Sequence, residues 1–448
     1  MRRMALCLLV VVWLVGAAHA QQPGEAPGPP LTLAQLEAMA QARNPTLRQA
    51  HAGVDGARAR AQQAGAWPNP VIGYFSEELA PGRTIRWGEH GAFAEQTIPL
   101  GGKLRLSRAV VERDVTRAEA LQDMQQLRIA SSVRVLFYDV LTTERRIVVL
   151  ERLAQLVAEA AGVSRQLFNV GAADRPDVLE ADIEARRAQL ALTAAKNELN
   201  STRMQLAALA GDLGVASRPL AGSIDEAIPE LDREVTVRVL VDRSPEVRAV
   251  RESAERARAV VARARRETFP DLFVRGGLAY NRELLETGTR GRPEAVGWEG
   301  VAEVGVSVPI FNRNQGGIAA ARADEVRADA ERSRLELVLQ ARAATVFDEY
   351  LTALREVEVY RDEIVPMADE AYRLYLGRYR DMAAAYPQVL TAQRTLFEMT
   401  TAYFESVEDA WRAALRLQGF LVGGGLDAPG RAGPELDTDT GVMSGGMR

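Results

Sequence analysis

The chain has 448 residues, of which 60 are acidic and 55 are basic, and its formal net charge is −5 at pH 7. Because the two kinds of charge are interleaved along the sequence, this balance excludes a polycation that binds nucleic acid. The single cysteine, Cys7, lies in an apolar N-terminal segment, so the rest of the chain can form neither a disulfide nor a thiolate metal site.

The N-terminus has the pattern of a secretory signal peptide. Arginines at positions 2 and 3 precede an apolar run over residues 4–15, and residues 18–20, Ala-His-Ala, form a small-x-small cleavage site. The apolar run is too short to span a bilayer. We therefore predict export across the inner membrane with cleavage after Ala20, followed by a Pro-rich tether at 21–30 with no evident role.

The rest of the chain reads as two copies of one unit. RNPTLRQA at 43–50 returns as RSPEVRAV at 243–250, and PDVLEAD at 176–182 returns as PQVLTAQ at 387–393. Between these points WPNP, TIPL and FYDVL recur in the same order as FPDL, SVPI and FDEYL. The predicted segments are repeat 1 at 31–215, a linker at 216–235, repeat 2 at 236–422 and a disordered Gly-rich tail at 423–448.

In each copy the pattern predicts a helix, two strands and a long helical hairpin. The first helix runs from Leu33 to Ala66 with a break at Asn44-Pro45, and it stops before prolines that bar its continuation. The alternation of apolar and polar residues in the strands suits a transmembrane barrel and a half-buried soluble hairpin equally well. The four predicted strands are 71–79, 92–100, 272–280 and 301–309.

A long helix follows the second strand of each copy. In the first, 102–168, apolar residues step alternately by four and three, a heptad seam that indicates supercoiling against a neighbour. The second, 318–378, contains Pro366, which predicts a kink. Irregular stretches follow both helices, and Pro176 and Pro387 then mark the first turn of a return helix. Each copy therefore ends in a helical hairpin.

No arrangement typical of catalysis or of cofactor binding is visible. Gly101-Gly102-Lys103 lacks the remaining residues of a phosphate-binding loop, because Thr97 stands where glycine is needed and Leu104 where Ser or Thr is needed. His51 and His90 are isolated and have no cysteine partners. We therefore predict a protein that is not an enzyme and that holds no cofactor and no resident metal.

Taken together, these features resemble the TolC family of outer membrane efflux proteins over about residues 31–421. The resemblance rests on LTLAQLEAMAQARNP at 31–45, QTIPLGGK at 96–103, the two hairpin turns and the duplication. QTIPLGGK is most similar to the heavy-metal branch that includes CzcC and CusC. The resemblance implies a mainly α protomer with four long coiled-coil helices and four strands, three copies of which form a 12-stranded β-barrel and a periplasmic α-barrel.

The resemblance also implies a function. The protein would be a passive exit duct for heavy-metal cations in the outer membrane of a Gram-negative bacterium, with most of the chain in the periplasm. An inner-membrane resistance-nodulation-division (RND) pump would supply the energy through a periplasmic adaptor. At the strand–helix junctions, prolines would end strand pairing and glycines would let the backbone turn. These junction residues are Pro99, Gly101, Gly102, Pro309, Gly316 and Gly317.

The resemblance places a closed aperture at the hairpin tips. The family commonly has acidic side chains after the second turn, but Gln388 and Thr391 stand there, whereas the first copy has Asp177 and Glu180. We expect the first copy to supply tip charge, although acids in a first helical turn also simply stabilise the helix. The candidate aperture residues are Asp174, Arg175, Asp177, Glu180, Arg378, Tyr379, Arg380, Asp381 and Gln388.

Other functions remain open from the sequence. A multidrug or type I secretion exit duct would have the same fold, and a soluble periplasmic coiled-coil scaffold without a pore would show the same helical pattern. A periplasmic metal-binding protein is disfavoured because the chain lacks clustered ligands. The sequence identifies neither the exported substrate nor the pump and adaptor.

Overall fold

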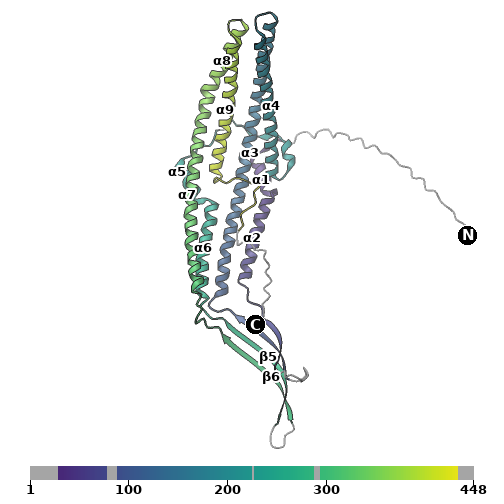
Figure 1. The fold of residues 1–448 in the computed structure, drawn as a ribbon, viewed down its shortest axis with the longest axis vertical. Coiled ribbons are helices and arrows are strands. Elements are labelled where there is room, and N and C mark those ends of the chain that lie inside the picture. The colour runs from purple at the N-terminus through teal and green to yellow at the C-terminus, as the bar shows by residue number, and fades with distance from the viewer. Residues whose placement is uncertain (1–28, 78–87, 225–226, 287–292, 432–448) are drawn as a thin grey trace, which may run out of the picture.

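The computed structural model describes residues 29–77, 88–224, 227–286 and 293–431. The predicted signal peptide and residues 432–448 of the predicted tail lie outside these ranges. A four-stranded sheet forms one end of an elongated chain, helices rise from it, and two helical turns form the opposite end (Figure 1). Within the described ranges, no helix combines the length and apolar content needed to cross a membrane.

In each copy, one helical path runs from the sheet to the helical turn at the opposite end of the molecule, which we call the tip. A second path is built from a helix that returns from the tip and from two short helices. In the first copy the long path is α3, and α4 returns from the tip toward α1 and α2. The second copy repeats this plan with α7 and α8 as the long path and α9 as the return (Figure 1). The helices are α1 Leu33–Arg43, α2 Pro45–Ala64, α3 Lys103–Asn169, α4 Arg175–Ala210, α5 Arg233–Arg243, α6 Pro245–Arg266, α7 Gln315–Val359, α8 Val365–Arg380 and α9 Tyr386–Gln418.

The end of α4 meets the start of α2. The Asn44 side chain accepts a hydrogen bond from the Thr46 backbone N–H at 3.0 Å and donates one to the Leu209 carbonyl at 3.1 Å. Arg43 pairs with Asp212 at 2.6 Å. The break predicted at this Asn-Pro step is present, because proline suits the first position of a new helix and lacks the N–H that a continuous one needs.

Helix α3 has 67 residues, which corresponds to a length of about 100 Å at a rise of 1.5 Å per residue. Three residues of its heptad seam, Ile147, Leu150 and Ala161, pack in a core shared with α4, α8 and α9, and Val140 belongs to a second core. The packing of the seam against neighbouring helices that was expected from the sequence is thus present, and its left-handed supercoiling stays a prediction. The seam positions that are buried are Val140, Thr143, Ile147, Leu150, Val157 and Ala161.

A π-helical turn, Tyr360–Ile364, separates α7 from α8, and Pro366 stands in the first turn of α8. Proline donates no backbone hydrogen bond, and its ring crowds the carbonyl four residues earlier. A wider turn at that point relieves both problems. The helical pattern is therefore disturbed in the turn that precedes the proline; the kink expected from Pro366 stays a prediction.

The sheet has the strand order β2-β3-β5-β6, and all neighbouring strands are antiparallel. The two copies pair with each other through β3 and β5. Strands β2 and β6 are the two edges of the sheet. Two predicted strands extended too far, since β3 ends before Pro99 and β6 ends before Pro309; proline cannot donate to the ladder. The strands are β2 Val71–Glu77, β3 Glu89–Ile98, β5 Leu272–Glu286 and β6 Pro293–Val306.

A second, small sheet joins the start of the first copy to the linker that follows that copy. Its strands β1, Leu31–Thr32, and β4, Leu220–Ala221, are parallel, so the predicted linker 216–235 contributes a strand. Tyr138 of α3 and Trp411 of α9 stack in the adjoining core, with ring centroids 3.8 Å apart. This layer holds the return helices against α3.

The beginning of the tail is ordered, contrary to our prediction. The Gly425 backbone N–H donates to Ser132 Oγ at 3.1 Å, and the buried amide of Gln125 donates to the Asp427 carbonyl at 3.2 Å. The prediction of disorder from Gly423 onward is therefore wrong for residues 423–431. A Gly-rich composition indicates flexibility, but this backbone hydrogen-bonds to side chains of α3, including the buried amide of Gln125, which also donates to Thr46.

Candidate functional site

Over the regularly paired residues, the two faces of the large sheet differ in charge. Residues that pair directly across strands share a face, and successive residues alternate between faces. All charged side chains of the regularly paired residues 71–77, 89–98, 272–281 and 297–306 lie on one face. We call this the charged face, and its charged residues are Glu77, Glu89, Glu95, Arg275, Glu299 and Glu303.

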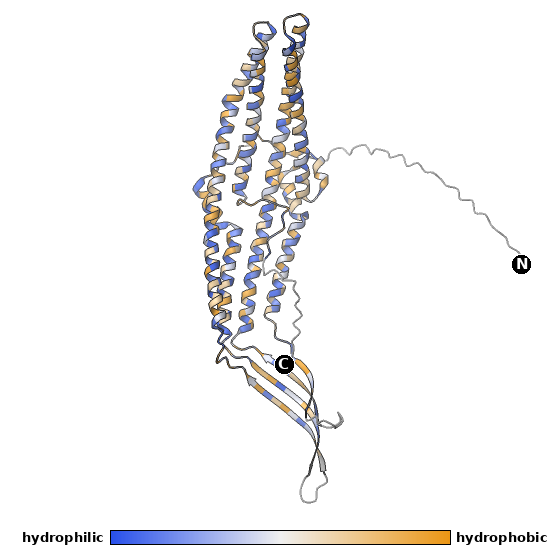
Figure 2. Ribbon diagram, viewed as in Figure 1, coloured by the Kyte–Doolittle hydropathy of each residue, from blue (hydrophilic) through white to orange (hydrophobic). Residues whose placement is uncertain are grey.

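The opposite face, which we call the apolar face, is exposed along most of its length. Figure 2 shows apolar and polar residues alternating along the strands. Leu278 and Trp298 are 65% and 75% exposed, respectively, and Trp298 contacts Tyr280 edge to face at 5.5 Å. A large exposed apolar surface indicates contact with lipid or with another protein. The apolar face includes Ile72, Tyr74, Ala92, Leu272, Val274, Leu278, Tyr280, Trp298, Val304 and Val306.

The first strand–helix junction is held by glycine geometry and a buried lysine. Gly101 and Gly102 have φ angles of 70° and 73°, a region that costs other residues free energy. A Cβ on Gly101 would lie 2.9 Å from the Cβ of Phe269. The ammonium of Lys103, the first residue of α3, lies 2.9 Å from Asp271 Oδ1. At this junction the left-handed turn therefore lies at the two glycines.

The second junction turns at a different residue from the one expected. Gly316 and Gly317 lie in the first turn of α7, and the left-handed residue is Asn314, with φ 56°. The Asn314 amide donates to the Ala264 carbonyl at the end of α6, at 2.9 Å. A Cβ on Gly317 would lie 2.1 Å from Asn314 Oδ1. The expectation that the glycines make the turn is wrong, because asparagine tolerates this conformation and Gly317 makes room for its side chain.

At the far end of the molecule, tyrosines of the second hairpin pack against the first. The Tyr379 hydroxyl donates to Ser164 Oγ of α3 at 3.4 Å, and the Tyr372 hydroxyl donates to the Leu156 carbonyl at 3.4 Å. The rings of Tyr379 and Tyr386 are 5.6 Å apart. Burial raises the pKa of Tyr372 to about 12 and also raises the pKa values of Tyr379 and Tyr386. The tyrosines therefore stay neutral and link the two tips.

A charged contact joins the return helices of the two hairpins. Arg394 of α9 donates to Glu184 Oε1 of α4 at 2.6 Å, and the Glu184 side chain is only 9% exposed. The hydrogen bond to Glu184 raises the pKa of Arg394, as a carboxylate partner favours the charged form. Arg187 shares the same carboxylate at 3.3 Å. The two hairpins therefore contact each other through α3 with α8 and through α4 with α9.

The structure places all nine candidate aperture residues at this end, on or next to the two turns. Tyr379 is buried, Asp177 is half-buried, and the other seven are exposed. Asp177 is close enough to Tyr379 to contribute to the rise in its pKa. The turns themselves are made by Gly171, with φ 75°, and Met382, with φ 57°.

Several contact residues were missed by sequence reasoning. Ser164, Glu184 and Arg394 lie within regular helical pattern and carry no local signal of a contact between hairpins. Lys103 was considered as part of a phosphate loop and of the QTIPLGGK motif, but not as a residue that makes an ion pair. A lysine in the first turn of a helix is unfavourable beside the positive end of the helix dipole, and this signal could have indicated a carboxylate partner such as Asp271.

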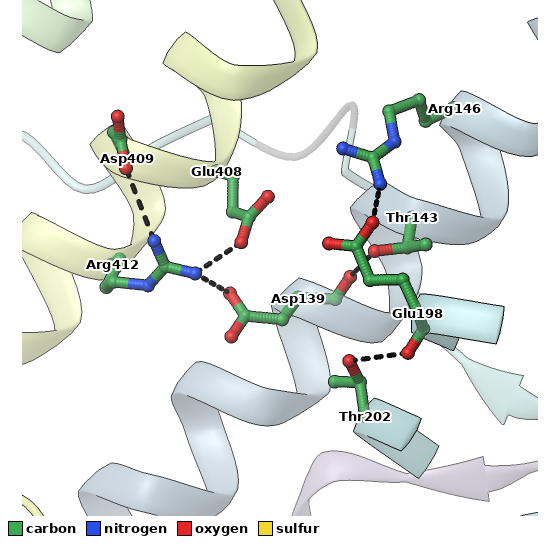
Figure 3. A network of polar contacts seen from close by, with 8 residues as sticks. All are labelled: Asp139, Thr143, Arg146, Glu198, Thr202, Glu408, Asp409 and Arg412. Carbon is green, nitrogen blue, oxygen red and sulfur yellow. Dashed lines mark hydrogen bonds and ion pairs between the residues drawn. The ribbon is translucent and has the colours of Figure 1, made fainter. Parts of the chain in front are cut away.

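A polar network crosses the middle of the bundle (Figure 3). Arg412 of α9 donates to Asp139 of α3 at 3.4 Å and also pairs with Glu408 and Asp409 of its own helix. Burial raises the pKa of Asp139 to about 7, in spite of the neighbouring Arg412. Across the described ranges, no group of three or more His, Cys, Asp or Glu side chains is placed to hold a metal ion.

Comparison with known proteins identifies the class to which this fold belongs. The family model described as outer membrane efflux protein matches residues 36–212 and 237–421. The chain therefore belongs to the outer membrane efflux protein family. The two matched segments correspond to the two copies of the repeat.

Individual relatives are similar along most of their length. The cobalt-zinc-cadmium resistance protein CzcC of Cupriavidus metallidurans is 26% identical over 405 residues, which cover 89% of this chain and 91% of that protein. The nickel-cobalt-cadmium resistance protein NccC of Alcaligenes xylosoxydans xylosoxydans is 28% identical and covers 76% of each chain. The outer-membrane channel OprN has the same fold, with a TM-score of 0.72, 19% identity and coverage of 88% of this chain and 91% of that one.

Proposed function

We propose that three copies of this chain form a passive exit duct through the outer membrane. The observation that carries the proposal is the sheet, which has one charged face, one exposed apolar face and two unpaired edges. Lipid tolerates no open sheet edge, and four strands are too few to close a transmembrane barrel. If β2 of one copy pairs with β6 of the next, twelve strands close with the charged faces inward.

The substrates that we propose are heavy-metal cations. Two relatives of the chain are named for resistance to cobalt, zinc, cadmium and nickel. The charged face carries five carboxylates and one guanidinium among the described, regularly paired residues, and a lumen of that sign attracts cations. No chemical step is required of the duct, so the energy comes from an inner-membrane RND pump through a periplasmic adaptor. The signal peptide is removed after Ala20, and the helices lie in the periplasm.

The assembly is tested by a matched pair of substitutions. Leu278 and Val301 lie at neighbouring depths of the sheet, on the apolar face and the charged face, respectively. An arginine near the middle of the lipid-facing surface costs about 2–4 kcal/mol, so Leu278→Arg should abolish the heat-modifiable trimer in the outer membrane fraction. Val301→Arg should assemble. Equal assembly of both variants, or a wild-type protein that is a water-soluble monomer, would contradict the proposal and favour the scaffold.

The substrate class is tested in the native bacterium. Deletion of the chain should reduce growth in cobalt, zinc, cadmium or nickel salts and leave resistance to organic drugs unchanged. Complementation with the wild type should restore metal resistance, and complementation with Leu278→Arg should not. Loss of drug resistance with normal metal resistance would instead assign a multidrug duct of the same fold.

A further inference from the structure

Arg275 is the only lysine or arginine among the regularly paired residues 71–77, 89–98, 272–281 and 297–306 of the sheet. It lies in one row across the four strands, Val71–Glu95–Arg275–Glu303. Directly paired residues have Cβ atoms roughly 4.5–5.5 Å apart. The guanidinium therefore lies between a carboxylate of β3, Glu95, and a carboxylate of β6, Glu303, on the charged face.

The guanidinium is held against the sheet by aromatic rings and not by its acidic neighbours. It lies over the ring of Phe93, 4.0 Å from the centroid, and 5.7 Å from that of Phe75. Within the described part of the chain, no ion pair joins Arg275 to Glu95 or Glu303. Stacking of this kind orients a guanidinium and leaves its N–H donors accessible.

Glycines on the same face leave room for the two phenylalanine rings on which Arg275 lies. The Phe93 ring lies over Gly73, where an added Cβ would be 2.5 Å from the ring. The Phe75 ring lies over Gly91, where the corresponding distance is 2.6 Å. Any larger residue at either glycine would lift the ring from the sheet. Five residues on three strands thus combine to fix one positive charge on the charged face.

Glu95 and Glu303 without a cation between them would suit a divalent metal, which is bound by several carboxylate oxygens. A duct must not retain its cargo, because conduction requires binding that is weak enough for release. We propose that Arg275 is a selectivity-determining residue that lowers the affinity of this row for divalent cations and moderates the cation preference of the pore. The inference rests on the proposed function, in which the charged faces line the lumen.

The test is ion conduction by the purified trimer in planar bilayers, with Arg275→Gln compared with Arg266→Gln. Arg266 also stacks on a phenylalanine, Phe269, with its guanidinium carbon 5.0 Å from the ring centroid, but it ends α6 outside the sheet. For Arg275→Gln we expect the K⁺/Cl⁻ permeability ratio to rise at least about threefold, because each row then keeps only its negative charges. Half-block by Cd²⁺ should occur at a concentration roughly tenfold lower.

Arg266→Gln should match the wild type, and Arg275→Lys should retain most of the wild-type behaviour. If Arg275→Gln matches Arg266→Gln in both measurements while the wild type conducts, the role of Arg275 is refuted. The proposed function as an exit duct is then unaffected. If the wild-type trimer forms no channel, the proposed function fails together with this assignment.

Cysteine labelling gives a second measurement that does not depend on the conducting state. The only native cysteine is Cys7, which the mature protein lacks in our proposal. In outer membrane vesicles, Arg275→Cys should react faster with a cationic than with an anionic methanethiosulfonate reagent, because carboxylates surround the position. Val274→Cys, on the apolar face, should be protected by lipid. Equal rates with the two reagents at position 275, or preferential labelling at position 274, would overturn the assignment.

Discussion

Lys103, the first residue of α3, donates a hydrogen bond to Asp271, which immediately precedes β5, at 2.9 Å. The same carboxylate accepts the backbone N–H of Leu100 at 3.2 Å, and Glu267 lies 3.6 Å from the ammonium. The lysine side chain is only 10% exposed. This contact fastens the strand-to-helix junction of the first copy to the helix-to-strand junction of the second.

Asp271→Ala should therefore loosen the base of the bundle. The substitution leaves a nearly buried ammonium beside the positive end of a helix dipole, which is unfavourable, and it removes hydrogen bonds to a charged group. Since Asp271 is 37% exposed, we expect a loss of about 1–2 kcal/mol per protomer, measured as a lower Tm of the detergent-solubilised trimer. Glu112→Ala, which removes an exposed pair with Arg108 on α3, should cost less than about 0.5 kcal/mol. Equal losses would contradict a special role for the junction.

Two glycine substitutions at the junctions should change the free energy of unfolding in opposite directions. Gly101→Ala forces a left-handed residue to carry a Cβ against Phe269, at a cost of about 1–2 kcal/mol per protomer. Gly316→Ala adds a Cβ with no heavy atom within 4 Å in a helical turn, so it should stabilise by about 0.5–1 kcal/mol. Thermal unfolding of both variants measures the difference. A stabilising Gly101→Ala would show that the junction is not held as the structure describes.

The elements that were predictable from the sequence are those fixed by neighbouring residues. The Asn44-Pro45 break, the heptad seam of α3 and the distortion before Pro366 all follow from local backbone chemistry and periodicity. The hairpin turns are also local. Asn314 was missed because Gly316 and Gly317, two and three residues away, offered a stronger turn signal.

The contacts that define the candidate site were less accessible to sequence reasoning. Lys103 and Asp271 are far apart in the chain, as are Ser164 and Tyr379. No periodicity relates such partners, because their proximity results from the return of the chain and the pairing of β3 with β5. The charged face was visible as an alternation, but its continuity across strands depends on a register that only the structure supplies.

Stability should depend on pH through Asp139. Its pKa is raised to about 7 from the ordinary 3.8, so the folded protein holds this proton more tightly than the unfolded chain. The contribution to the free energy of unfolding is therefore largest below about pH 4 and decreases as the pH rises toward 7. Asp139→Asn should remove this decrease and raise stability near pH 8 by on the order of 1–3 kcal/mol. The measurement is Tm of the trimer from pH 4 to pH 8.

Asp362→Asn serves as the control for that series. Asp362 pairs with Arg361 on the surface, and its pKa is lowered by the hydrogen bond, so it does not titrate between pH 4 and pH 8. The profile of this variant should follow the wild type. A lower Tm for Asp139→Asn at neutral pH would mean that the ion pair with Arg412 outweighs the burial of the carboxylate.

The tip acids Asp177 and Glu180 have two competing roles, which one experiment separates. As aperture charges they would attract cations. As acids near the N-terminus of α4 they would instead stabilise the helix, Asp177 in the first turn by about 0.3–1 kcal/mol and Glu180, in the second turn, by less. We expect Asp177→Ala with Glu180→Ala to lower the K⁺/Cl⁻ permeability ratio in planar bilayers at least about twofold, because in the proposed duct the permeating ions pass these carboxylates at the tip. Asp324→Ala with Glu331→Ala, on α7, should leave the ratio unchanged. If the tip variant has wild-type conductance and cation preference but a lower Tm, these carboxylates serve only the helix N-terminus.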